Sequence, residues 1–280
     1  MRNSHFRGDL MTNNEYRARA EISNSDLKLF AESPRKLELK KLGELEQEQT
    51  QALALGSALH KLVLERESFN SEYAVLENCD KRTKAGKAYY DEFCQKNAGK
   101  EILDANIFAQ ISAMEQSIYS IPRVRELLSS GVAEKPFFAE LNDVKCKCKV
   151  DFLSTSTNAL IDVKTTSSLK DFKRAMGAFG YFTQASFYAD ILEKNGIQVD
   201  SVFFIVVEKT APFLTGIFRI DYADLDGGRE IYSKRLEKLK FCRENGFYPP
   251  LYENITEIGG DFIYDMELCV KPSFYDIERG

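Results

Sequence analysis

Two aspartates and a lysine lie near the middle of the chain, in two short apolar runs separated by a Ser/Thr/Asn-rich stretch. They are Asp151, Asp162 and Lys164. Carboxylates held side by side repel each other, so such a pair requires a compensating cation. A hard divalent ion bound by oxygen ligands meets this requirement. The first chemistry that the sequence suggests is therefore that of a divalent-metal site.

The two apolar runs are typical of strands joined by a tight turn at Ser156–Thr157. A turn centred there places Asp151 and Asp162 directly opposite each other. Because side chains alternate along a strand, Asp162 and Lys164 share one face of the second strand. An ordinary hairpin with a polar face also explains this pattern, so the hairpin alone does not decide between the two interpretations.

The apolar residues of the hairpin follow the same alternation. We expect Val150 and Phe152 to face one way while Asp151 faces the other, and Ile161 and Val163 to face the core. This arrangement keeps the polar groups together on the opposite face of the sheet.

A third carboxylate precedes this hairpin. The segment from Val132 to Leu141 is predicted to be a strand, and Asn142-Asp143 forms its turn into the strand that carries Asp151. A two-residue turn sets Glu134 opposite Asp151, although a slip of one residue in the register would separate them.

One of the two histidines, His60, lies in a predicted helix near residues 52–65 that is apolar around most of its surface. A histidine in such a helix is ordinarily a satisfied core residue. Gly56, one turn earlier on the same face, lets another group approach closely, which favours a ligand role for His60.

Composition limits the class of protein. The 280 residues are 44% apolar and 29% charged, enough for a sizeable core in one or two domains. No apolar run approaches the ~20 residues that span a bilayer, and the amino terminus lacks the apolar stretch of a signal peptide. The six cysteines lack paired C-x-x-C spacing, which favours reduced thiols. We therefore expect a cytoplasmic protein with no membrane partner.

The order of elements predicts an α/β (α+β) fold, with a mixed sheet flanked by helices and a helical amino-terminal layer. We expect residues 1–20 to be a mobile segment, residues 21–250 to form a single domain, and residues 251–280 to be a tail without an assigned role. Helices are expected from Ser23–Ser25 with a break at Ser33-Pro34, and over 104–120, 123–129, 181–194 and 223–244. Strands are expected over 73–76, 201–208 and, at a sheet edge, 214–220.

Three basic stretches, 28–41, 81–87 and 170–174, contrast with the net charge of −5. The total charge argues against non-specific coating of nucleic acid but allows a local basic groove. Solvated surface is the alternative explanation of each stretch.

Several motifs in one order carry a resemblance. They are Gly56-Ser-Ala-Leu-His60, Lys149-Val-Asp151, Ile161-Asp162-Val-Lys164-Thr-Thr166 and Gln184-Ala-Ser-Phe-Tyr188. This series resembles the PD-(D/E)xK nuclease superfamily, in its RecB-like branch, and is most similar to RecE-type exodeoxyribonuclease VIII. The resemblance spans roughly residues 13 to 250 and implies a restriction-endonuclease-like core. The opening Ile22-Ser-Asn-Ser25 and the loop from Arg82 to Lys87 also look like that family.

The resemblance implies a role for each site residue. Mg²⁺ or Mn²⁺ would be held by His60, Asp151, Asp162 and the carbonyl group of Val163. Lys164 would orient the attacking water, and Gln184 and Tyr188 would support the site. Glu134, placed by the turn register rather than by the resemblance, would add a catalytic carboxylate. DNA would be held by the residues of the amino-terminal helices, the basic loop and the strand end, namely Ser25, Arg35, Arg82, Lys84, Lys87, Thr165 and Thr166.

The resemblance also implies a reaction and partners. Such enzymes degrade linear double-stranded DNA from 5′ ends in phage-type recombination, assemble as ring-shaped trimers or tetramers, and work with a single-strand annealing protein. Val150 replaces the proline of the superfamily name. Ser33 stands where iron–sulfur relatives have a cysteine, so no iron–sulfur cluster is expected. A single-strand or structure-specific nuclease and a non-catalytic DNA-binding scaffold are the alternatives.

Overall fold

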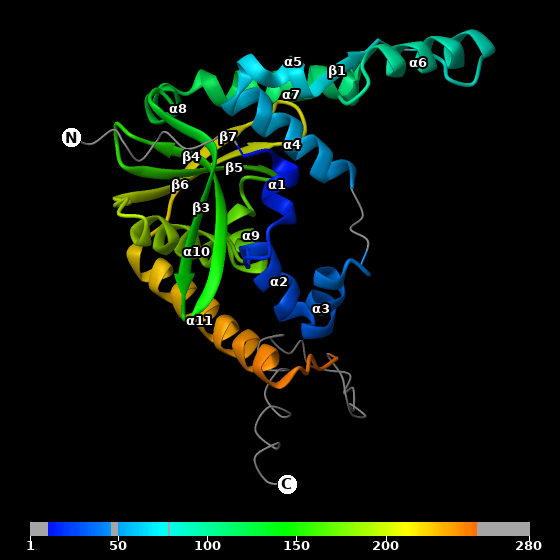
Figure 1. Cartoon of the computed structure of the whole chain (residues 1–280). Coiled ribbons are helices and arrows are strands. Elements are labelled where there is room, and N and C mark those ends of the chain that lie inside the picture. The colour runs from blue at the N-terminus through cyan, green and yellow to red at the C-terminus, as the bar shows by residue number, and fades with distance from the viewer. Residues whose placement is uncertain (1–10, 46–49, 78, 251–280) are drawn as a thin grey trace, which may run out of the picture.

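A five-stranded mixed sheet forms the centre of the molecule (Figure 1). The computed structural model describes residues 11–45, 50–77 and 79–250. In sheet order the strands are β3 (Gly131–Leu141), β4 (Val144–Ser154), β5 (Ala159–Thr166), β6 (Ser201–Glu208) and β7 (Thr215–Arg219). Strands β5 and β6 pair in parallel, whereas the other neighbours are antiparallel. The predicted mixed sheet with β7 at its edge is confirmed.

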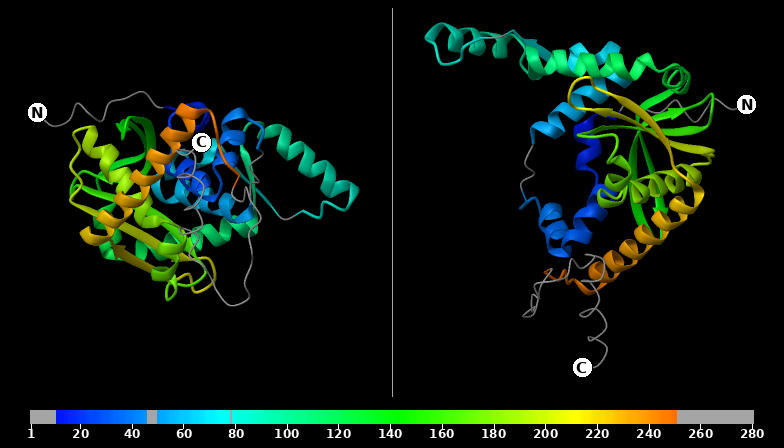
Figure 2. Two further views of the ribbon diagram at one scale, coloured as in Figure 1. Left: turned by 90° about the horizontal axis from the view of Figure 1, so that it is seen from below. Right: turned by 180° about the vertical axis from the view of Figure 1, so that it is seen from behind.

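Helices cover both faces of this sheet (Figures 1 and 2). One face packs against α2 (Asn24–Glu32), α9 (Phe172–Ala178), α10 (Tyr181–Lys194) and α11 (Tyr222–Asn245). The other face packs against α4 (Gln51–Leu64), α7 (Ala105–Ser120) and α8 (Pro122–Leu127). Each face thus has its own hydrophobic cluster, and the strand residues alternate between the two clusters.

Both predicted hairpin registers are found. Leu141 pairs with Val144 across the Asn142-Asp143 turn, where both turn residues have positive φ, as a tight hairpin turn requires. Phe152 pairs with Ile161 across the next turn. These pairs put Asp151 next in register to both Glu134 and Asp162.

The alternation predicted for β4 is wrong at one point. Val150 packs in the cluster beneath α10, whereas Phe152 packs in the cluster beneath α4. Glu134, on the facing strand, has φ 49°, and the ladder is interrupted between Ala133↔Phe152 and Lys135↔Val150. This left-handed residue shifts the phase of the alternation at Asp151, in the manner of a bulge.

The remaining elements are short or peripheral. They are α1 (Asn13–Ala18), α3 (Pro34–Leu42), η1 (Arg66–Ser68), α5 (Phe69–Glu72), β1 (Tyr73–Leu76), α6 (Lys84–Lys96) and β2 (Glu101–Asp104). Strands β1 and β2 form a separate parallel pair. Helix α6 extends away from the sheet as an arm (Figures 1 and 2).

Part of the segment predicted to be mobile is helical. Helix α1 begins at a capping box between Thr12 and Glu15, and Lys147 of β4 donates hydrogen bonds to the carbonyl groups of Tyr16 and Arg19. Residues 1–10, and the tail over 251–280, lie outside the described residues. Among the described helices, none is long and apolar enough to cross a membrane.

The amino-terminal layer is joined to the sheet by backbone pairing and a buried ion pair. Ile22 bridges Cys146 of β4. The buried carboxylate of Asp26 pairs with Lys40 at 2.7 Å and with Lys41 at 3.0 Å, which ties α2 to α3. The predicted break between these helices at Ser33-Pro34 is confirmed, because Pro34 begins α3.

Candidate active site

The carboxylate of Asp151 reaches across from β4 to the backbone of β5. Its Oδ2 accepts a hydrogen bond of 2.9 Å from the backbone N–H of Val163. This contact lies just beyond the last paired residues of the two strands, at the point where the alternation of β4 shifts. The Asp151 carboxylate is close enough to Asp162 and Lys164 for their charges to act on it.

Helix α4 brings His60 to the same place. Its Nε2 lies 2.5 Å from the carbonyl oxygen of Val163, and its Nδ1 lies 3.5 Å from Oδ2 of Asp151. Apart from its chain neighbours and the backbone of its own helix, no described atom lies within 4 Å of where a Cβ on Gly56 would stand, which leaves this helix face open one turn before His60. His60, Asp151 and Glu134 each offer a ligand atom, and these atoms lie within 4.8 Å of one another.

Asp162 lies on β5 with its side chain toward α10. Its Oδ1 accepts a hydrogen bond of 2.6 Å from Nε2 of Gln184. The Nζ of Lys164 lies 2.5 Å from its Oδ2 and forms an ion pair. The predicted common face of Asp162 and Lys164 is therefore found, and Gln184 of α10 fixes the orientation of the carboxylate.

The acceptor capacity of Asp162 is not fully used. Its Oδ2 is buried and has no partner with hydrogen-bond geometry among the described residues, although the Lys164 ammonium is close. The ammonium therefore meets this oxygen as a charge, without the directed hydrogen bond that a buried carboxylate oxygen ordinarily receives. This oxygen, together with the donor set of His60, Glu134 and Asp151, fits a divalent cation with oxygen and imidazole ligands.

The pKa values of Asp151 and Lys164 are consistent with a site for a divalent cation. Burial, together with repulsion by Asp162, raises the pKa of Asp151 to about 6. Burial lowers the pKa of Lys164, but the charges of Asp162 and Asp151 outweigh burial and raise it above its ordinary value. Lys164 is therefore a fixed positive charge at neutral pH rather than a base.

Two contacts of the site were not predicted from the sequence. Lys149 forms an ion pair with Glu134, and its Nζ donates a hydrogen bond of 2.7 Å to Oδ1 of Asn13. The Nζ of Lys164 lies 5.3 Å from the centre of the Tyr181 ring. Both residues had a usable signal, since Lys149 lies two positions before Asp151 on a strand and Tyr181 three positions before Gln184 on a helix.

The remaining predicted support residues lie around this centre. Burial raises the pKa of Tyr188 well above its ordinary value, so its phenol is neutral, and Asp151 and Asp162 act on it in the same direction. Thr165 continues β5 after Lys164. The hydroxyl of Thr166 donates to the carbonyl group of Ser168 and accepts from its N–H, which fixes the turn that leaves the strand.

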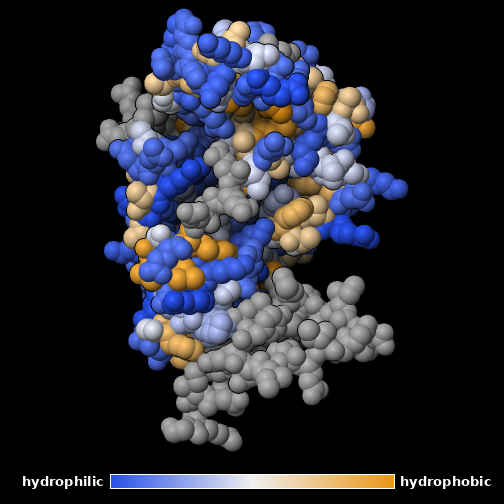
Figure 3. Space-filling view, turned by 90° about the vertical axis from the view of Figure 1, so that its right-hand side faces the viewer, coloured by the Kyte–Doolittle hydropathy of each residue, from blue (hydrophilic) through white to orange (hydrophobic). Residues whose placement is uncertain are grey.

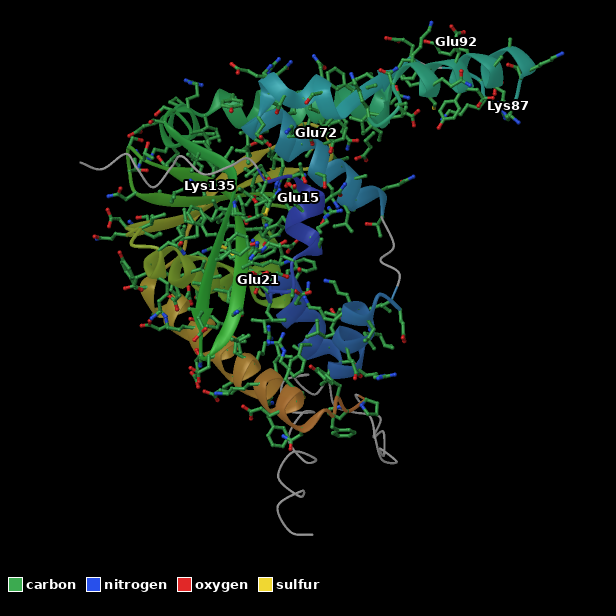
Figure 4. The ribbon with its side chains drawn as sticks, in the orientation of Figure 1. Glu15, Glu21, Glu72, Lys87, Glu92 and Lys135 are labelled. Carbon is green, nitrogen blue, oxygen red and sulfur yellow. The ribbon has the colours of Figure 1, made fainter. Side chains whose placement is uncertain are left out.

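The predicted DNA-binding residues fall into two separate regions. Ser25 and Arg35 are exposed on α2 and α3, where Ser25 is hydrogen-bonded to Ser23 and Arg35 is paired with Glu38. Arg82, Lys84 and Lys87 lie at the amino-terminal end of α6. This end is far from the sheet, as Figure 4 shows for Lys87. The structure therefore does not bring the basic loop together with the carboxylates.

The face that carries α1 and α4 is predominantly hydrophilic, with separate hydrophobic patches, as Figure 3 shows. Figure 4 places Glu15 of α1 on the same side of the molecule.

Comparison with solved structures finds a similar fold. A "Putative exonuclease" from Eubacterium rectale matches with a TM-score of 0.65 and 17% identity, over 93% of this chain and 98% of that chain. A second structure, SSO0001, has a TM-score of 0.31 and 14% identity over 69% of this chain and 89% of its own, which supports no argument. A search of curated proteins found no match.

Comparison with protein families identifies the chain more directly. Residues 23–257 match the PDDEXK-like domain of unknown function (DUF3799). The match includes His60, Asp151, Asp162, Lys164 and Gln184, the side chains that converge in the structure. The chain belongs to this PDDEXK-like family, and thereby to the PD-(D/E)xK nuclease superfamily that its sequence motifs resemble.

Proposed function

We propose that this protein is a divalent-metal-dependent DNA exonuclease that hydrolyses phosphodiester bonds. The observation that carries the proposal is the convergence of His60, Asp151 and Asp162 with the charged Lys164. Membership of the PDDEXK-like family and similarity to the Eubacterium rectale protein support nuclease chemistry.

The residues that would hold the metal ion are Asp151, Asp162, His60, Glu134 and the carbonyl oxygen of Val163. A bound Mg²⁺ or Mn²⁺ supplies positive charge against the scissile phosphate and acidifies the attacking water. Gln184 holds Asp162 in place, and the N–H of Val163 holds Asp151. Both carboxylates are thus oriented before the substrate arrives.

Lys164 acts on the charge that develops during the reaction. Its ammonium is protonated at neutral pH, for the reason given above, and is paired only to Asp162 among the described carboxylates. A positive donor beside the reacting phosphate stabilises the negative charge of the transition state more than that of the ground state. The Tyr181 ring beneath it limits where the ammonium can lie.

The finer proposal is digestion from 5′ ends of linear double-stranded DNA during phage-type recombination. Ser25 and Arg35 would receive the terminal 5′-phosphate, and Arg82, Lys84, Lys87, Thr165 and Thr166 would contact the DNA backbone. A ring-shaped trimer or tetramer and a single-strand annealing partner complete this proposal. Its support is the order of sequence motifs that resembles the RecE type.

The test compares three substrates with purified protein in Mg²⁺ and in EDTA. They are linear duplex with a 5′-phosphate, the same duplex after dephosphorylation, and closed circular duplex. We expect Mg²⁺-dependent release of nucleotides from the linear form, slower release without the 5′-phosphate, and an intact circle. Cleavage of the circle would indicate an endonuclease. A preference for single strands would indicate a different nuclease of the superfamily. DNA binding without any cleavage would indicate a non-catalytic scaffold.

A further inference from the structure

One exposed aromatic residue lies in contact with the candidate site and has no role in the chemistry described above. Phe179 follows α9 and has a relative exposure of 54%, whereas Phe172, at the start of the same helix, is buried at 1%. Burying an aromatic ring is favourable, so a large ring left in solvent beside a functional site indicates a surface that a ligand covers.

Aromatic contacts connect this ring to the site. The Phe179 ring centre lies 5.8 Å from that of Tyr181, and the Tyr181 ring lies 5.3 Å from Nζ of Lys164. Tyr181 is itself held by Phe172 and Phe204, at 5.8 and 5.5 Å between ring centres. The exposed ring is therefore the outer end of a packed aromatic row that begins under the proposed phosphate-binding lysine.

The local backbone keeps the ring in position. Gly180 has φ 68° and makes the corner between α9 and α10, a conformation that other residues adopt only with strain. The two residues before Phe179 are the exposed Gly177 and Ala178, which carry little side-chain bulk beside the ring. Phe179 is consequently presented on a rigid corner rather than on a long loop.

A cation lies over the Phe179 ring, and two more are exposed on the helix that precedes it. The Nζ of Lys28, from α2, lies 5.6 Å from the centre of the Phe179 ring, and Lys173 and Arg174 are exposed on α9. An aromatic face with basic side chains around it is suited to nucleic acid, whose bases stack on the ring while phosphates meet the cations. A purely apolar partner would leave these charges without compensation.

We propose that Phe179 is a stacking platform for an unpaired or terminal nucleobase of the DNA that enters the site, and that Lys28 contacts a phosphate next to that base. The inference rests on the proposed nuclease function and adds a residue that determines how the DNA end is held. Stacking on an aromatic ring tolerates every base, so Phe179 contributes affinity without sequence preference.

The test uses duplex oligonucleotides with 2-aminopurine or an abasic nucleotide at successive positions from the end. Binding is measured in EDTA, and steady-state cleavage in Mg²⁺, for the wild type, Phe179→Ala and Phe179→Tyr. Tyr222→Ala is the matched control, because Tyr222 is an exposed aromatic residue at the start of α11. Thermal unfolding and mass by light scattering verify the fold and the assembly of each variant.

We expect Phe179→Ala to weaken DNA binding and to raise KM by about thirtyfold, the middle of the range for loss of one stacked base, with a much smaller change in kcat. Phe179→Tyr retains binding. An abasic nucleotide at one position weakens DNA binding by the wild type to the same extent and causes no further loss of binding by Phe179→Ala. The fluorescence of 2-aminopurine at that position is quenched only by proteins that retain the aromatic ring.

Equal affinities of Phe179→Ala and Tyr222→Ala, or additive effects of Phe179→Ala and every abasic position, would overturn the proposal. An altered mass of Phe179→Ala with unchanged DNA binding would show that the ring belongs to a contact between subunits instead. Failure of the wild type to cleave any DNA contradicts the proposed function, whereas quenching and binding in EDTA still decide the role of Phe179.

Discussion

At the scale of single residues, Asp151 combines an unfavourable environment with a proposed ligand role. Burial, followed by repulsion from Asp162, raises its pKa to about 6, compared with 3.8 for an unperturbed aspartate. A carboxyl whose pKa is raised on folding destabilises the folded state as the pH rises above its unfolded pKa of 3.8, and this cost is complete above about pH 6. The metal-free site is therefore expected to lower the stability of the protein at neutral pH.

We predict that Asp151→Asn stabilises the metal-free protein while abolishing cleavage. A shift of about two pKa units corresponds to roughly 2–3 kcal/mol, so Tm in EDTA should rise by several degrees at neutral pH. The amide oxygen can still accept the hydrogen bond from Val163. The advantage should shrink as the pH falls from about 6 toward 3.8, where Asp151 is protonated in the unfolded wild type as well as in the folded one.

The measurement is thermal unfolding of wild type and variant in EDTA across this pH range. Asp224→Asn, which neutralises an exposed carboxylate in the first turn of α11, is the control. A Tm of Asp151→Asn at or below that of the wild type at neutral pH would contradict the assigned environment of Asp151.

The positions of the site residues could be predicted from short-range patterns, whereas two of their contacts could not. The turns at Asn142-Asp143 and Ser156-Thr157 set the registers that align Glu134, Asp151 and Asp162. The positive φ of Glu134 has no such marker, since the residue is neither glycine nor asparagine. The resulting shift of alternation in β4, and the ion pair of Glu134 with Lys149, depend on the folded sheet.

At the scale of elements, the contact between α2 and α3 includes one buried carboxylate, that of Asp26. Burial raises the pKa of Asp26, but hydrogen bonding and attraction from Lys40 and Lys41, with the N–H of Ser23, outweigh it and lower the pKa to about 2. A lowered pKa stabilises the folded state above the unfolded value near 3.8, and this contribution disappears as the pH falls toward 2.

We predict that Asp26→Asn lowers the free energy of unfolding by roughly 2–3 kcal/mol at neutral pH, because folding lowers the pKa of Asp26 from 3.8 to about 2. The difference from the wild type should decrease between pH 4 and pH 2, as Asp26 becomes protonated. Urea unfolding at several pH values measures both effects. A difference that stays constant down to pH 2 would indicate that packing, rather than charge, accounts for the loss.

Long elements with clear periodicity or a continuous apolar run were predictable, and the confirmed bounds of α10 and β6 are examples. Helix α1 escaped prediction because none of its residues is buried and its contacts come from Lys147 of a distant strand. Strand β2 escaped for a similar reason, since four residues gain their structure only by pairing with β1. Tertiary contacts, rather than local propensity, form these short elements.

At the scale of the whole molecule, the α6 arm, which carries Lys84 and Lys87, extends away from the central sheet (Figure 2). If DNA spans both regions, the arm contributes affinity through phosphates but does not affect the chemical step. Each phosphate contact adds about 0.9 to the slope of log K against log salt. Arg82 contributes less than Lys84 and Lys87, because it is paired with Asp80.

We predict that replacing Arg82, Lys84 and Lys87 by alanine weakens DNA binding and reduces the salt slope by about 2, with kcat unchanged. Fluorescence anisotropy at several salt concentrations measures the slope. The matched control replaces Lys234, Lys238 and Lys240 of α11, which removes the same charge elsewhere. Equal slopes for the two triple variants would show that the arm does not meet DNA.

The most direct test of the metal-dependent site is Asp162→Asn. Asparagine has nearly the same shape and keeps an acceptor for Gln184, but it removes the charge and the unpartnered carboxylate oxygen. The rate of Mg²⁺-dependent nucleotide release from linear duplex DNA is compared with that of the wild type and Asp224→Asn. We predict that the rate falls by at least about a hundredfold for Asp162→Asn alone. An Asp162→Asn protein that cleaves DNA as fast as the wild type would contradict the metal-dependent site.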